Sequence, residues 1–158
     1  MSDVLKKIDV FGIGLPRTGT TSLSKALDTL GYSGTHSCSI FGSRGGGDGA
    51  SGVYFVDNQC HKDIGGILLD NKESKFILTT RDDSGWEKSI DSFSLLGLPS
   101  PSKYSALVSN LFESSDLNNL LIINFELNSD IDNWKKICSF LKKSVPDKDF
   151  PCIQNLKK

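Results

Sequence analysis

A glycine-framed turn between an apolar stretch and a helical pattern constrains the fold of this chain more than any other feature. The turn reads GLPRTGTT and spans 14–21. It follows the apolar run VFGI, which is typical of a buried strand, and precedes Leu23, Leu27 and Leu30, which repeat on one helix face. The amides of such a turn and the positive end of the helix point to the same place. The sequence therefore predicts an α/β unit with an anion site at its turn.

The rest of the chain repeats this alternation of strand and helix patterns. Further strands are predicted near His36 and over 53–58, 75–80 and 119–126. Further helices are predicted over 61–71, 84–93 (with Ser84 as N-cap), 104–113 and 130–143 (with Ile131 on its inward face). This order predicts a three-layer α/β fold of the phosphate-loop type, with a mostly parallel central sheet flanked by helices. Ligands bind beyond the carboxyl ends of the strands in such sheets, where Gly14, Asp57, Arg81 and Glu126 fall.

Length and charge indicate one domain without a general attraction for polyanions. The chain has 158 residues, 37% of them hydrophobic, which suits a single domain over 1–158. Its net charge of −1 favours neither nucleic acid nor a membrane surface as partner, so an anion site must be built locally. Within this domain, the glycine-rich segment 41–52 is predicted to be a mobile surface loop.

Cysteine usage and hydropathy indicate a soluble, cytoplasmic protein. The four cysteines form no C-x-x-C pair and are interpreted as free thiols of a reducing compartment. Asp9 interrupts the apolar run near the N-terminus, so this run is a poor signal peptide. No stretch approaches the roughly 20 apolar residues that a membrane span needs.

The turn differs from the loop of nucleotide triphosphatases at one charged position. The triphosphatase pattern is G-x-x-x-x-G-K-[ST], and Thr20 stands here in place of its lysine. Arg17 can supply a cation from within the loop, and its guanidinium can contact two oxygens of one anion. The hydroxyls of Thr20 and Thr21 can donate to the same group. The alternative is a tight strand–helix turn with a surface arginine.

Three blocks resemble the sulfotransferase superfamily, and most closely its short, bacterial-type members. GLPRTGTTSLSKAL is similar to the 5′-phosphosulfate loop of that family. KFILTTRDDSGWEKSIDSF is similar to its 3′-phosphate site, where a strand ends in an arginine and a serine follows eight residues later, as Arg81 and Ser89 do. The late blocks LLIINFE and NWKKICSFLKKSVPDKDFP resemble its last strand, helix and C-terminal ending.

This resemblance implies an enzyme, a sulfotransferase that uses 3′-phosphoadenosine 5′-phosphosulfate (PAPS) and releases 3′,5′-bisphosphoadenosine (PAP). The sulfonate would pass to a hydroxyl or amine acceptor that the sequence does not name, and no metal is implied. Arg17 would stabilise charge on the bridging oxygen of the leaving nucleotide. The residues implied to bind the donor are Pro16, Arg17, Thr18, Gly19, Thr20, Thr21, Arg81 and Ser89.

Three residues are candidates for the base that accepts the acceptor's proton. Asp57 matches the family's position at the end of the strand preceding the arginine-bearing strand, and His36 matches a histidine that short members carry after the first helix. His61 follows Asp57 by about one helical turn. Each has a structural alternative: a helix cap for Asp57, a strand end for His36 and a solvated helix position for His61.

Two other functions stay open at this point. One is a nucleotide or small-molecule kinase of the phosphate-loop type, for which only Glu126 offers a magnesium ligand after an apolar strand. The other is a non-catalytic nucleotide-binding relic, because the chain has only 92–118 for acceptor binding and lacks the family's basic C-terminal Arg-Lys-Gly loop.

Overall fold

The computed structural model describes residues 7–38, 41–44, 49–57, 60–89 and 98–151. Within these ranges it describes the backbone alone for residues 37–38, 41–44, 57, 60–61 and 89. No helix in these ranges is long and apolar enough to cross a membrane.

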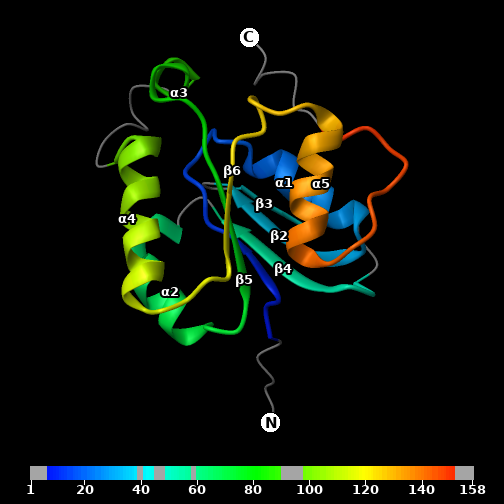
Figure 1. Cartoon of the computed structure of the whole chain (residues 1–158), viewed down its shortest axis with the longest axis horizontal. Helices are drawn as coiled ribbons and strands as arrows, with labels where there is room; N and C mark the ends of the chain where they lie inside the picture. Colours follow the sequence, from blue (N-terminus) through cyan, green and yellow to red (C-terminus); the bar gives the residue numbers. More distant parts are fainter. Residues whose placement is uncertain (1–6, 39–40, 45–48, 58–59, 90–97, 152–158) are drawn as a thin grey trace.

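A six-stranded sheet forms the centre of the molecule, and its strand order is β3-β2-β4-β1-β5-β6. The strands are β1 Val10–Gly12, β2 Tyr32–Cys38, β3 Phe41–Arg44, β4 Gly52–Asp57, β5 Lys75–Thr79 and β6 Leu120–Ile123. All neighbouring pairs are parallel except β2 and β3, which are antiparallel. Because the parallel strands share one direction, their carboxyl ends meet at one edge of the sheet, the upper edge in Figure 1.

Helices cover both faces of this sheet, which gives three layers (Figure 1). The helical elements are α1 Thr20–Thr29, the 3₁₀ turn η1 Cys60–Asp63, α2 Ile64–Asp70, α3 Asp83–Ser89, α4 Pro101–Ser114 and α5 Asp130–Leu141. Helices α1 and α5 pack on one face through a cluster that includes Leu27, Ile77 and Trp134. Helices α2, α3 and α4 pack on the other face through a cluster that includes Phe76 and Val108.

Strand alternation explains why both faces are apolar. Neighbouring residues of a strand point to opposite sides, so Ile77 enters one cluster while Phe76 and Leu78 enter the other. All three side chains are at most 1% exposed. The predicted fold class is therefore confirmed: an α/β fold with a mostly parallel sheet flanked by helices.

Four details of the predicted elements are wrong. Residues 41–44, expected within a loop, form strand β3, whose backbone hydrogen bonds to β2 need no side-chain pattern. Residues 45–48 of that loop lie outside the described residues. Helix α3 begins at Asp83 with the Asp82 carboxylate accepting from Gly85 N at 2.7 Å, so Asp82 and not Ser84 caps it. The 61–71 helix is a 3₁₀ turn followed by a shorter α-helix, and Ile131, expected inward, is 50% exposed in the first turn of α5.

The described cysteine side chain agrees with the expectation of a free thiol. Cys138 is buried and forms no disulfide. Burial raises the pKa of this thiol, which keeps it protonated and unreactive at neutral pH. The side chains of Cys38, Cys60 and Cys152 lie outside the described part of the chain.

Candidate anion-binding site

The loop between β1 and α1 is held from behind by side chains that bind its carbonyl groups. The four hydrogen bonds are Tyr104 Oη to Ile13 O at 2.8 Å, Thr18 Oγ1 to Leu15 O at 2.6 Å, Trp86 Nε1 to Pro16 O at 2.8 Å, and Arg81 Nη1 to Arg17 O at 3.2 Å. The donors come from α4, the loop itself, α3 and the end of β5. Because its carbonyls are fixed to the protein, the loop can present its amides on the other side.

The backbone of this loop is unusual at the positions where it turns. Arg17 has φ of 67° and Gly19 has φ of 103°, so both lie in the left-handed region. For Arg17 this costs about 1–2 kcal/mol. Such a cost persists only where the surrounding structure imposes it, which occurs most often at binding sites.

The glycines of the loop are required by their neighbours. A Cβ atom on Gly14 would collide with Thr79 Oγ1, and one on Gly19 would lie 2.9 Å from the ring of Phe125. Thr79 Oγ1 lies 2.8 Å from Thr18 Oγ1. Since Thr18 uses its own proton to bind Leu15 O, Thr79 is the donor in this pair. The loop is therefore packed closely against the end of β5 and the turn after β6.

Helix α1 begins at this loop, and no described side chain caps its positive end. Its N-cap is Gly19, and its first turn holds no acidic residue. The first amides of a helix have no intrahelical acceptor and together carry about half a positive charge. Among the described residues, no backbone carbonyl accepts a hydrogen bond from the amides of Gly19, Thr20 or Thr21. These amides can hold the oxygens of an anion.

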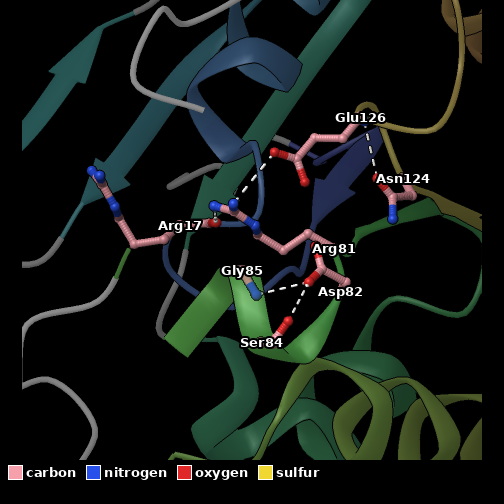
Figure 2. A network of polar contacts seen from close by, with 7 residues as sticks. All are labelled: Arg17, Arg81, Asp82, Ser84, Gly85, Asn124 and Glu126. Atoms are coloured by element: carbon pink, nitrogen blue, oxygen red, sulfur yellow. Dashed lines mark hydrogen bonds and ion pairs between the residues drawn. The ribbon is translucent and has the colours of Figure 1, made fainter. Parts of the chain in front are cut away.

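Arg81 places a buried guanidinium beside the same loop. Its side chain is 7% exposed, and its Nη2 atom lies 3.3 Å from a carboxylate oxygen of Glu126. Figure 2 shows the guanidinium between this carboxylate and the backbone carbonyl of Arg17. The third nitrogen, Nε, is buried and has no hydrogen-bond partner among the described residues. A cation with one unpaired, buried donor suits an anionic ligand.

The turn between β6 and α5 forms another wall of the site. Asn124 fixes this turn, because its side-chain oxygen accepts from Glu126 N at 3.0 Å and its carbonyl accepts from Asn128 Nδ2 at 3.0 Å. Phe125 lies against Gly19 and packs on Phe150, with ring centroids 4.8 Å apart. The C-terminal PDKDFP segment therefore supports the turn that carries Glu126.

The predicted donor-binding residues of the loop have different polar groups available. The Pro16 carbonyl and the Thr18 hydroxyl are already bonded within the protein, so Thr18 can offer an anion only its amide. Thr21 is half-buried at the start of α1. Arg17 is exposed, and its side chain extends away from Arg81 in Figure 2.

The candidate bases lie at the same edge of the sheet as the loop. His36 is buried, and its Nε2 atom lies 3.2 Å from Thr20 Oγ1. The backbones of His36 and Asp57 are close, because β2 and β4 are neighbours and Asp57 pairs with Ser37. His61 lies in η1. The side chains of Asp57, His61 and Ser89 lie outside the described part of the chain, and Ser89 ends α3.

Three residues that support the loop from behind were not predicted from the sequence. Trp86, Tyr104 and Thr79 are each separated from the loop by more than fifty positions, and no spacing motif links them to it. Their one sequence signal is that tryptophan and tyrosine carry a polar group, which needs a partner when the ring is buried.

Comparison with known proteins places this loop in a family. The family model of the sulfotransferase domain matches residues 9–63, about a third of the chain. This part of the chain is therefore similar to a sulfotransferase domain. The matched segment runs from the start of β1 to the end of η1, so it contains the loop, His36 and Asp57. Arg81 and Ser89 follow it. No curated protein matches the chain significantly.

Proposed function

We propose that this protein is a sulfotransferase that uses PAPS as donor and transfers its sulfonate to a hydroxyl or amine acceptor. The observation that carries the proposal is the arrangement of two positive sites at one edge of the sheet. One is the start of α1, which no described side chain caps, next to a loop whose carbonyls accept hydrogen bonds from Trp86 and Tyr104. The other is the buried guanidinium of Arg81 with its unpaired Nε. PAPS carries two anionic groups, at its 5′ and 3′ positions.

The residues present fit this donor. The amides of Gly19, Thr20 and Thr21 would hold the 5′ phosphosulfate at the helix start, and Arg81 together with Ser89 would hold the 3′ phosphate. Arg17 is the cation within the loop, and the exposed side chain is free to turn toward the bridging oxygen. It would act by charge alone, because an arginine keeps its proton at any physiological pH. When bound, the donor supplies a sulfonate group joined to a phosphate through one bridging oxygen.

The transfer requires a base beside the acceptor. A bond forms between the acceptor's oxygen or nitrogen and the sulfur, the bond from sulfur to the bridging oxygen breaks, and the acceptor's proton passes to the base. His36 is supported by its 3.2 Å contact with Thr20, because this places its ring at the helix start. Asp57 is supported by its position at the end of the neighbouring strand, and His61 follows in η1.

Calorimetric titration with matched nucleotides tests the proposal. The full chain, without metal, should bind PAP at least about tenfold more tightly than 5′-AMP, because Arg81 can contribute a charge-assisted contact only to the 3′ phosphate. Equal affinities for PAP and 5′-AMP would contradict the proposed donor. Tight binding of ATP that depends on Mg²⁺ would instead favour the kinase.

Turnover separates an enzyme from a binding relic. PAP release from PAPS, followed in the presence of a panel of phenols, alcohols and amines, should exceed the rate without acceptor. Binding of PAP with no acceptor-dependent release across the panel would favour the relic.

A further inference from the structure

Glu126 is the counter-ion that Arg81 meets in this structure, and the two groups differ in their access to water. The ion pair joins a side chain that is 7% exposed to one that is 31% exposed. A buried guanidinium requires a compensating charge, since an unpaired one would cost several kcal/mol. The carboxylate can turn into solvent while the guanidinium cannot. The pair is therefore asymmetric: Glu126 is the partner that can leave.

The carboxylate of Asp82, which is also near Arg81, forms hydrogen bonds with other groups. Asp82 follows Arg81 in the chain, but its side chain accepts from Gly85 N at 2.7 Å and from Ser84 Oγ at 3.0 Å. Figure 2 shows it turned toward the start of α3. Among the described residues, Glu126 is the carboxylate that forms an ion pair with Arg81.

The backbone that carries Glu126 is fixed, so an exchange of partners needs only side-chain rotation. Asn124 binds the amide of Glu126 and the side chain of Asn128, and Phe125 is wedged between Gly19 and Phe150. The guanidinium is also fixed, through Nη1, to the carbonyl of Arg17. An anion that arrives at Arg81 therefore meets a stationary cation whose carboxylate partner can rotate away.

We propose that Glu126 is a displaceable counter-ion that sets which anions Arg81 accepts. It repels an incoming anion and competes for Nη2, so a ligand must offer Arg81 more than one carboxylate does. A phosphate monoester carries nearly two negative charges at neutral pH and can displace it. A singly charged group has no such advantage. This inference rests on the proposed function, in which the 3′ phosphate of the nucleotide binds at Arg81, and makes Glu126 a specificity-determining residue of that site.

The test is the affinity of Glu126→Gln for nucleotides that differ at the 3′ position. Glutamine keeps the shape and a hydrogen-bond acceptor for Nη2 but removes the competing charge. Removing a like charge at this distance should tighten PAP binding by about tenfold, while 5′-AMP, which lacks the 3′ phosphate, should change by less than about twofold. Glu113→Gln is the matched control: it makes the same change of net charge at an exposed position of α4 and should leave both affinities unchanged.

The outcomes separate this inference from the proposed function. If the wild-type chain binds PAP more tightly than 5′-AMP but Glu126→Gln binds PAP equally or more weakly, the inference is overturned and the proposed donor stands. If the wild-type chain does not distinguish the two nucleotides, both fail. Circular dichroism confirms that the variant is folded, and Glu126→Ala, which should also tighten PAP binding, replaces it if it is not.

Discussion

At the scale of single residues, the two buried tryptophans make the same bond in different places. Trp86 Nε1 donates to Pro16 O in the anion-binding loop, and Trp134 Nε1 donates to Lys148 O in the C-terminal segment, both at 2.8 Å. Both side chains are nearly inaccessible, at 2% and 1% exposure. Of the two, Trp86 alone has its acceptor in the loop. Comparing variants of the two tryptophans therefore measures how much a contact to a loop carbonyl contributes to binding.

Trp86→Phe should weaken nucleotide binding, and Trp134→Phe should not. Each change removes one buried donor and should lower the free energy of unfolding by about 1–2 kcal/mol. In Trp86→Phe the freed carbonyl also lets the loop relax, so the affinity for PAP should fall by about fivefold, equivalent to about 1 kcal/mol. Urea denaturation measures the first effect and calorimetry the second. Equal affinities of the two variants would show that this contact stabilises the fold without shaping the site.

Sequence spacing could predict the residues of the anion-binding loop but not the residues that hold this loop in place. Gly14, Gly19 and the threonines are close together in the chain, so one motif reveals them. The bond from Trp86 to Pro16 depends on where α3 packs, and the pair of Arg81 with Glu126 depends on β5 and β6 being neighbours. Neither relation leaves a local pattern in the sequence.

At the scale of elements, the weakest helical pattern illustrates what propensity can and cannot predict. Helix α2 carries Gly65 and Gly66 in its first turns, and glycine disfavours a helix at both positions. Their surroundings differ: a Cβ on Gly65 meets nothing within 4 Å, whereas one on Gly66 would lie 2.6 Å from a carboxylate oxygen of Asp63. That carboxylate caps the helix by accepting from Gly66 N.

Gly65→Ala should stabilise the protein, and Gly66→Ala should not. Alanine at position 65 should raise the free energy of unfolding by about 0.5–1 kcal/mol, because it lowers the entropy of the unfolded chain and fills open space. At position 66 the same gain is offset by displacement of the Asp63 cap, worth about 1 kcal/mol. Thermal and urea denaturation of both variants measure the difference. A gain at position 66 equal to that at position 65 would mean that the cap contributes nothing.

Elements whose apolar pattern reflects burial were predictable. Helix α1 repeats leucines along its one buried side, and the centre of β5, residues 76–78, is a continuous apolar run because both faces of this strand are covered. Strand β3 has no such pattern, since backbone pairing with β2 defines it. The N-cap of α3 could not be predicted because Asp82 and Ser84 are both suitable capping residues, and the hydrogen bond from Gly85 N shows that Asp82 is the cap.

At the scale of the whole molecule, strand order brings together residues that lie far apart in the sequence. Strand β1 lies between β4 and β5, so its loop faces the ends of both, and β6 adds the turn with Glu126. The alternation of strands and helices in the sequence predicts a parallel sheet, but it does not predict the order of the strands within it. The sequence therefore places the candidate residues at one edge of the sheet, whereas their mutual contacts follow from the topology.

The junction of α3 and α4 gives the fold a dependence on acidic pH. Asp83, in the first turn of α3, accepts from the amide of Ser102 at 3.0 Å and from its hydroxyl at 2.5 Å, and these bonds join the two helices. They lower the pKa of Asp83. Bonds from Gly85 N and then Ser84 Oγ lower the pKa of Asp82 in the same way. Both carboxylates are exposed in part, so each effect is modest and screened by salt.

The sign of this dependence follows from the direction of the shifts. Where the folded-state pKa lies below that of the unfolded chain, the unfolded chain binds more protons, so stability is present above about pH 4 and is lost as the pH falls through the folded-state value. Asp83→Asn should therefore be less stable than the wild type at pH 7, and the difference should shrink steadily below pH 4, where the wild-type carboxylate is protonated. Asp70→Asn, at an exposed carboxylate with no hydrogen bond among the described residues, is the control and should not reduce the acid sensitivity. Free energies of unfolding from urea titrations between about pH 2.5 and pH 7 measure the effect. A difference between wild type and Asp83→Asn that stays constant across this range would show that the bonds to Ser102 do not require the charged carboxylate.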